Sequence, residues 1–322
     1  MEIIRKEKVH VVHPRGVSEY MDFDLLGFGS FGCVFQCKNK FDGKKYAIKN
    51  IVHKSKDKYV IQILNEIRIT SALNHPNIIR YFTSWVELVD NEDPEISFLK
   101  ENDDSMNTLS ICSKKKISAY LVMECADLTL DKFITMHYKS EVFDKNHKSI
   151  ISQIANGIQY LHNLNPKCAH GDLTTKNILL VNNGNMQVKI CDFGMSTFIV
   201  PDTHKTIENL PLNTHVSTIN TKKTADELCT DAVELQYNSQ YKNHLYFDIF
   251  RFGIIIFQLI TYFTTSMHRS KLIEKFKQRQ IFTGISIIDD MISEDKFKQP
   301  TINMFCTLCD SYQEFLLKHQ YN

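Results

Sequence analysis

Short apolar runs separated by turn residues fill the N-terminal third of the chain, a pattern typical of β-strands. The pair Asp42-Gly43 gives the strongest turn signal, because Asp-Gly accepts the backbone angles of a two-residue hairpin. The strands predicted from this pattern cover residues 23–26, 33–38, 45–51, 78–86 and 119–124.

One helix interrupts this series of strands. Apolar residues recur at three- and four-residue spacing from Val60 to Ile67, which places them on one helical face. Pro76 ends the predicted helix, because proline lacks a backbone N–H and restricts the residue before it. A polar insert at about residues 88–117 is acidic at its start and basic at its end, and we expect a long solvated loop there.

From Leu130 onward the hydrophobic pattern becomes helical, apart from two short strands predicted at residues 177–181 and 186–191. The apolar run at residues 252–260 is far shorter than the roughly 20 residues of a membrane span, so it predicts a buried helix. One face of an earlier helix is lined by Ile150, Ile151, Ile154, Ala155, Ile158 and Leu161. The pattern thus predicts a small β-rich unit and then a larger helical unit, with a boundary near Cys125.

Composition narrows the class of protein. The 38 Lys and Arg residues nearly balance the 37 Asp and Glu residues, and a net charge of +1 argues against a general nucleic-acid or anionic-membrane binder. Nine cysteines without a secretory signal indicate reduced thiols in a cytosolic or nuclear protein. The pair Cys306 and Cys309 lies in a helical apolar stripe without a second Cys/His pair, which favours core packing over zinc.

Glycine is scarce, yet three of the 11 glycines, Gly27, Gly29 and Gly32, fall within six residues. One interpretation is a dinucleotide-binding turn, but that motif requires a helix directly after the glycines, and the residues from Cys33 onward favour a strand. Glycines between two antiparallel strands can instead lay their backbone N–H groups over phosphates, because no Cβ blocks the approach.

Charged and amide residues farther along the chain fit the same chemistry. Lys49 lies on the strand predicted at residues 45–51. Glu66 lies on the inner face of the predicted helix, where its carboxylate could pair with that lysine. Each of these charges, taken alone, is more commonly a surface group. Asp172 could accept the proton of an attacking hydroxyl, while Asn177 and Asp192 supply oxygen ligands suited to Mg²⁺ on phosphates.

In this order the motifs resemble those of the protein kinases. The matching motifs are G-x-G-x-x-G-x-V from Gly27, A-I-K ending at Lys49, the helical Glu66, H-x-D-x-x-x-x-N from His170 and D-F-G from Asp192. The resemblance covers about residues 20–312 and implies ATP and Mg²⁺ as cofactors. It also implies an α+β, bilobal protein-kinase fold, with a short extension at 1–19, a small β-rich N-lobe at 20–125 and a larger helical C-lobe at 126–322.

The resemblance implies a role for each matching residue. Lys49 would contact the α- and β-phosphates, and Glu66 would pair with it. Asp172 would be the catalytic base, and Asn177 and Asp192 would hold the metal. The nucleotide would lie against Leu26, Gly27, Phe28, Gly29, Ser30, Phe31, Gly32, Val34, Ala47, Met123, Glu124 and Cys125. In that list Val34 and Ala47 would enclose adenine, Met123 would stand behind it, and the residues from Glu124 would form the hinge.

Several stretches outside these motifs are similar to the kinases of the alpha subunit of eukaryotic translation initiation factor two. They are the segment 75–87 with the chain's only tryptophan, Trp85, the polar insert, the segment 127–130, and Phe263 to Arg269. This resemblance implies a cytoplasmic serine/threonine kinase that phosphorylates that subunit and so lowers protein synthesis under stress. It further implies a homodimer through the N-lobes, and we expect no nucleic-acid-binding domain and no membrane segment.

The chain departs from the kinase pattern at positions in the part of the large lobe that holds the protein substrate in other kinases. Gly171 replaces an arginine that grips a phosphorylated activation loop in many kinases, and Thr174 replaces a lysine. Lys176 has the spacing seen in tyrosine kinases and could supply the missing charge. Two further departures are Glu227, where a threonine is usual, and Gln299, where an arginine pairs with Glu234. Two hypotheses follow: an active kinase with a modified activation segment, or an impaired decoy that binds nucleotide and interferes with active relatives.

Overall fold

In the computed structural model the chain forms two compact units. The structure describes residues 17–29, 32–54, 57–90, 115–137, 140–182, 184–199, 242–295 and 297–308. The first unit holds the described residues up to Leu64 together with Phe82–Glu124. The second holds Asn65–Tyr81 and the described residues from Cys125 onward.

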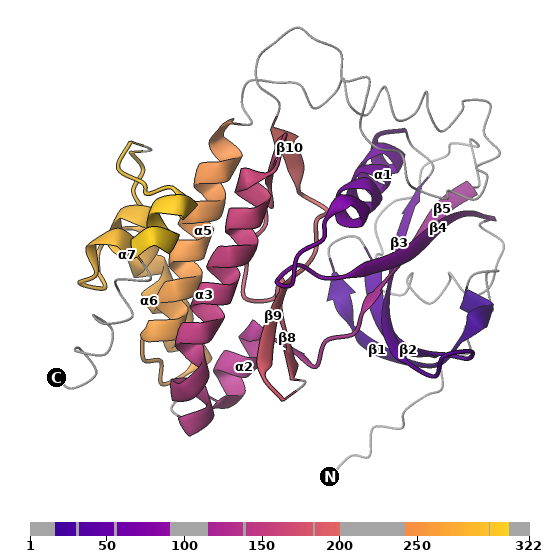
Figure 1. The fold of residues 1–322 in the computed structure, drawn as a ribbon, viewed down its shortest axis with the longest axis horizontal. Coiled ribbons are helices and arrows are strands. Elements are labelled where there is room, and N and C mark those ends of the chain that lie inside the picture. The colour runs from indigo at the N-terminus through magenta and orange to yellow at the C-terminus, as the bar shows by residue number, and fades with distance from the viewer. Residues whose placement is uncertain are drawn as a thin grey trace, which may run out of the picture. The chain divides into compact units, whose positions relative to one another are not determined.

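A five-stranded antiparallel sheet is the framework of the first unit (Figure 1). Its order is β1-β2-β3-β5-β4. The first three strands are therefore neighbours in chain order, and β5 lies between β3 and β4. The strands are β1 at Tyr20–Gly29, β2 at Gly32–Asn39, β3 at Lys45–Lys54, β4 at Tyr81–Asp90 and β5 at Lys115–Glu124. A short 3-10 helix, η1 at Val17–Glu19, precedes them.

One face of this sheet carries an apolar core. Its buried members are Tyr20, Cys37, Ile48, Tyr120 and Val122. The single tryptophan packs against this cluster, because the Trp85 ring stacks on that of Tyr120 with centroids 5.0 Å apart. Since successive strand residues point to opposite faces, the residues between these core positions lie on the other face.

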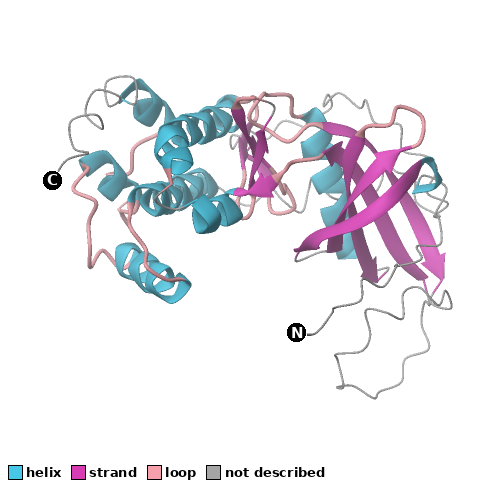
Figure 2. Cartoon of the chain, turned by 90° about the horizontal axis from the view of Figure 1, so that it is seen from below, coloured by secondary structure: helices cyan, strands magenta, loops and turns pink. Residues whose placement is uncertain are grey.

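The second unit is helical and is built around two long helices that pack together (Figures 1 and 2). These are α3 at Glu141–Asn163 and α5 at Lys242–Ile260. The predicted apolar face of α3 is confirmed, because all six of its residues are buried. Further helices are α2 at Leu130–His137, α6 at Ser266–Lys277 and α7 at Ser286–Met291, and residues 302–308 are also helical. The helix α1 at Asp57–Ala72 belongs partly to each unit.

Short strands hold the loops of the second unit in place. The strands β6 at Leu128–Thr129, β8 at Ile178–Asn182 and β9 at Met186–Ile190 form one small sheet, and β7 at Lys167–Ala169 pairs with β10 at Thr197–Ile199. The segment 170–177 therefore runs between β7 and β8, and only Cys191 separates Asp192 from the end of β9. These small sheets fix both ends of the segments that carry the predicted catalytic residues.

Some predicted strand boundaries are wrong. Ile78 and Ile79 are buried outside β4, and Ile78 forms an isolated bridge with Ile190, so packing within the second unit explains their apolar character. The strands also extend into both ends of the polar insert, because β4 ends at Asp90 and β5 begins at Lys115. Pairing of Lys116 with Lys54 shows that backbone ladder bonds, rather than side-chain pattern, set this end of β5.

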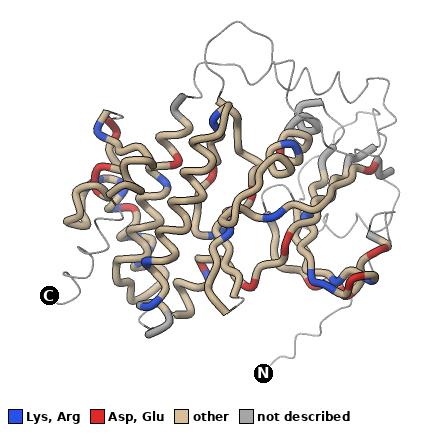
Figure 3. The backbone as a smooth tube through the Cα atoms, viewed as in Figure 1, with Lys and Arg blue, Asp and Glu red and all other residues tan. Residues whose placement is uncertain are grey.

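Other features of the fold agree with the sequence. The run at 252–260 lies in α5 and is almost entirely buried. Within the described ranges, no helix has both the length and the apolar character to cross a membrane. Around Cys306, the neighbours Ile302 and Phe305 are buried, as core packing predicted, but Leu308 of the same stripe is exposed. Cys309 lies outside the described residues. Basic and acidic residues are interspersed along the described backbone (Figure 3).

Candidate active site

A fully buried carboxylate organises the loop between β7 and β8. Asp248 of α5 accepts the backbone N–H of His170 through Oδ2 at 2.8 Å and that of Gly171 through Oδ1 at 2.9 Å. His162 of α3 lies 3.0 Å from the same Oδ2 through Nε2. Because a buried carboxylate is costly without such partners, this arrangement fixes where the loop starts.

The side chain of His170 continues this scaffold. Its Nδ1 accepts the backbone N–H of Asp172 at 3.2 Å, so the proton is on Nε2, which lies 3.0 Å from the carbonyl oxygen of Cys191. The Ser196 hydroxyl donates to the His170 carbonyl at 2.8 Å. His170 therefore ties the predicted base to the residue immediately before Asp192.

Asp172 and Asn177 are brought into direct contact, as predicted from their spacing. The Asn177 side-chain amide donates to the Asp172 carbonyl at 2.8 Å and to its Oδ2 at 3.1 Å. Both bonds are made by Nδ2, so neither of them uses the amide oxygen of Asn177. The Asp172 side chain is 41% exposed, which leaves the carboxylate accessible to a substrate hydroxyl.

Two further carboxylates lie beside Gly194. A Cβ placed on Gly194 would be 3.1 Å from Glu66 Oε2 and 3.4 Å from Asp192 Oδ1. Glu66 is buried at the C-terminal part of α1, and Asp192 has a φ of +67°, a conformation that aspartate adopts more readily than most residues. Asn177 and Asp192 present the hard oxygen ligands that Mg²⁺ prefers, so the donor chemistry fits the predicted metal.

In the first unit, residues that are predicted to contact the adenine and the phosphates lie on one face of the sheet. In the ladder Val34 is opposite Lys49 and Ala47 is opposite Met123. Directly opposite residues share a face, and Ala47 and Lys49 are two apart on β3, so the four side chains lie on the face away from the tryptophan cluster. Lys49 and Ala47 are buried. The pairing of Lys49 with Glu66 stays a prediction.

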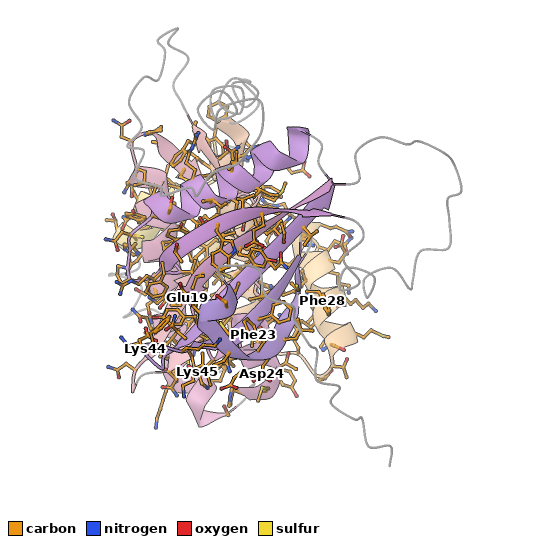
Figure 4. All side chains as sticks on the ribbon, turned by 90° about the vertical axis from the view of Figure 1, so that its right-hand side faces the viewer. Glu19, Phe23, Asp24, Phe28, Lys44 and Lys45 are labelled. Carbon is orange, nitrogen blue, oxygen red and sulfur yellow. The ribbon has the colours of Figure 1, made fainter. Side chains whose placement is uncertain are left out.

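The glycine-rich hairpin is partly described. Gly29 pairs with Gly32 at its tip, and Leu26 and Phe28 on β1 are exposed. Phe28 lies at the glycine-rich end of β1, whereas Phe23 and Asp24 lie nearer the start of that strand (Figure 4). Ser30 and Phe31 lie outside the described residues, and the hinge residues Glu124 and Cys125 are half-buried. Burial raises the pKa of the Cys33 thiol just beyond the hairpin, so this cysteine is a poor nucleophile.

Glycine serves different purposes at the two ends of the motif. A Cβ on Gly32 would lie 1.8 Å from the backbone oxygen of Asn50 on β3, so close strand approach excludes any side chain there. A Cβ on Gly27 would meet nothing within 4 Å. The structure therefore explains Gly32 by packing of the sheet, whereas the open space at Gly27 fits the predicted phosphate contact.

Gly171 is also required by the backbone. Its φ is +79°, and a Cβ there would lie 2.4 Å from the carbonyl oxygen of Met195. An arginine at this position therefore requires movement of the segment after Asp192. The present backbone therefore does not accommodate the arginine that many kinases have at this position.

The other departures from the kinase pattern are described in part. Lys176 is exposed, and Thr174 is half-buried with its carbonyl accepting the Asn177 N–H at 3.0 Å. Gln299 donates to the Ser293 carbonyl at 2.7 Å, while its buried Oε1 has no partner among the described residues. Glu227 and Glu234 lie outside the described residues.

A polar network beside the catalytic loop, residues 170–177 between β7 and β8, was not predicted from the sequence. The Thr175 hydroxyl, between Asp172 and Asn177 in the chain, donates to Asp131 Oδ1 of α2 at 2.9 Å. Arg269 of α6 donates to the same Oδ1 at 2.8 Å and to Gln258 Oε1 of α5 at 2.6 Å. Arg269 belongs to the segment 263–269 that resembled one kinase branch, and that resemblance was the one available signal.

These features define a class of enzyme. A buried lysine on the third strand of an antiparallel sheet, a catalytic-loop aspartate bonded to an asparagine, and a D-F-G segment after a short hairpin belong to the protein kinases. Residues 20–315 match the protein kinase domain. The chain therefore belongs to the protein kinase family.

The chain is similar to protein kinases of different kinds. The chain is 27% identical over 291 residues to the interferon-induced, double-stranded RNA-activated protein kinase of Mus musculus, covering 88% of this chain and 49% of the relative. It is 26% identical over 356 residues to the eIF-2-alpha kinase GCN2 of Schizosaccharomyces pombe, covering 85% of this chain and 21% of the relative. It is also 30% identical over 186 residues to the cyclin-dependent kinase-like 4 of Mus musculus, covering 58% and 45%. The chain spans about half or less of the length of these relatives.

Proposed function

We propose that the chain is an active, ATP-dependent serine/threonine kinase that phosphorylates the alpha subunit of translation initiation factor two. Phosphorylation of that subunit would lower protein synthesis, as in a cytoplasmic stress response. The observation that best supports catalytic activity is the hydrogen bond between Asn177 and Asp172. Asp248 and His170 hold the loop that carries both residues. A chain that served only as a decoy has no need of a base fixed in this way.

Each residue has a defined part in the proposed reaction. Asp172 takes the proton of the acceptor hydroxyl, and Asn177 orients its carboxylate through the bond to Oδ2. Lys49 would bind the α- and β-phosphates, with Glu66 as its partner. Asn177 and Asp192 would hold Mg²⁺, which neutralises charge on the phosphates. Lys176 would supply the cation that Thr174 does not.

The substrate is proposed from similarity rather than from the site. Two of the relatives reported above carry kinase domains that align with most of this chain, and one of them is named an eIF-2-alpha kinase. Trp85 and the segment ending at Arg269 both have structural roles here, which supports the resemblance to that branch. A homodimer through the first unit is a further proposal, and sedimentation showing monomer alone at high concentration would contradict it.

Transfer of labelled phosphate from ATP to the purified alpha subunit, in the presence of Mg²⁺, tests the proposal. We expect incorporation with the wild-type chain and its loss in Lys49→Met and Asp192→Asn. Lys45→Met is the matched control, because Lys45 is exposed at the start of the same strand. Lys176→Ala should slow turnover at least tenfold, and an unchanged rate would remove Lys176 from the mechanism. Nucleotide binding without any transfer would support the decoy instead.

A further inference from the structure

The catalytic loop lacks cations at two positions where many kinases have them. Gly171 and Thr174 are neutral, and Lys176, on the same loop, is exposed. A further positive charge, from α5, lies near the Asp172 carboxylate. Arg251 lies three residues after Asp248, the residue that anchors the start of the loop.

The guanidinium of Arg251 is placed beside the base. Its Nη1 is 3.9 Å from Asp172 Oδ1, and the side chains of the pair are 33% and 41% exposed. Its central carbon lies 4.7 Å from the centroid of the Phe247 ring, one turn earlier on α5. This cation–π contact restricts the long side chain, so less conformational entropy is lost when it holds the carboxylate.

The two oxygens of the Asp172 carboxylate therefore have different neighbours. Oδ2 accepts a hydrogen bond from Asn177 at 3.1 Å, and Oδ1 faces Arg251. An exposed ion pair contributes little to folding stability, so stability alone is a weak reason for this arginine. Orientation is a stronger one, because a small misplacement of a catalytic group slows the chemical step severely.

We propose that Arg251 is a positioning residue for Asp172, holding Oδ1 while Asn177 holds Oδ2, so that the carboxylate faces the acceptor hydroxyl. This inference rests on the proposed kinase activity. Among the described residues Arg251 contacts Asp172 and Phe247, and neither is predicted to touch the nucleotide. Its removal should therefore slow turnover and leave the KM for ATP unchanged.

Steady-state kinetics of Arg251→Met and Arg251→Lys test the inference. We expect Arg251→Met to lower kcat at least tenfold, with the KM for ATP within twofold of wild type. Arg251→Lys restores a cation and should recover most of the lost kcat, which a purely structural role would not give. Phe247→Leu keeps the charge but removes the ring beneath it, and we expect a smaller fall in kcat.

Arg279→Met is the matched control, because the Arg279 guanidinium also lies over a phenylalanine ring, that of Phe282 at 5.6 Å. It should leave kcat unchanged. A kcat for Arg251→Met within twofold of an active wild type would overturn the inference and leave the proposed function intact. An effect confined to the KM for ATP would also overturn it, as would an equal loss in the lysine variant. A wild-type chain without transfer to any protein would overturn both.

Discussion

The two outer glycines of the hairpin motif have different surroundings, so alanine should act differently at each. At Gly32 the added methyl would meet the Asn50 carbonyl at 1.8 Å, and the strands must separate to admit it. We expect Gly32→Ala to lower the free energy of unfolding by about 1–3 kcal/mol, the usual range for overpacking. Urea denaturation of the purified protein measures this change.

Gly27→Ala is the matched partner, because nothing lies within 4 Å of its Cβ position. Its stability should remain within about 0.5 kcal/mol of wild type, as for most open sites. Its affinity for ATP should fall, because the methyl occupies space predicted for a phosphate. Equal destabilisation by the two substitutions would contradict the distinction.

The individual site residues were predictable to the extent that their chemistry depends on short spacing. Asp172 and Asn177 are five positions apart on one loop, and the structure places them in hydrogen-bond contact. Arg251 and Asp131 were not predictable in this way, because α5 and α2 reach the catalytic loop from distant parts of the chain. A single charged residue on a helix carries no sequence signal for such a contact.

At the scale of elements, three helices meet the catalytic loop through the network of Thr175, Asp131, Arg269 and Gln258. Because Thr175 and Arg269 share one oxygen of Asp131, their contributions to stability should not be additive. We expect Thr175→Val and Arg269→Met to show a coupling energy of at least about 0.5 kcal/mol in a double-mutant cycle. Both single variants should also lower kcat, because they loosen the loop that carries Asp172.

Lys277 and Glu274 of α6 provide the control cycle. Their charged atoms are 3.8 Å apart and both side chains are largely exposed, so their coupling should be close to zero. A coupling energy between Thr175 and Arg269 no larger than that of the control pair would show that the network does not act as a unit.

The elements themselves were largely predictable where the hydrophobic pattern was long. The helix expected from Val60 to Ile67 corresponds to α1, and the apolar run at 252–260 lies in α5. Strands of two or three residues, such as β6 and β7, were missed because so short a run has no measurable period. Ile78 was assigned to a strand wrongly, because its burial beside Ile190 of β9 gives the same apolar signal.

At the scale of the whole molecule, the residues predicted to bind ATP and Mg²⁺ are divided between the two units. The first unit carries Lys49 and Ala47, and the second carries Asn177 and Asp192. A ligand that binds only the folded chain stabilises it by about 2.7 kcal/mol at 100 times its Kd. We expect ADP with Mg²⁺ to raise the unfolding temperature, and EDTA to remove the metal-dependent part of that rise.

Variants separate the two contributions. Asp192→Asn should keep the rise produced by ADP alone and lose the additional rise with Mg²⁺, because it removes a metal ligand. Lys49→Met should reduce both. An Mg²⁺-dependent rise that persists in Asp192→Asn would show that this residue does not hold the metal.

The bilobal organisation was predictable because strand-like and helix-like patterns occupy separate parts of the chain.

The backbone at Gly171 has a consequence for how this kinase can change over time. With a φ of +79° and the Met195 carbonyl oxygen 2.4 Å from the Cβ position, a single substitution to arginine meets an obstructed site. The segment after Asp192 would have to move first, and that move brings no benefit without the arginine. A single substitution therefore does not give this chain the arginine contact, and regulation by phosphorylation is easier to acquire at other surfaces.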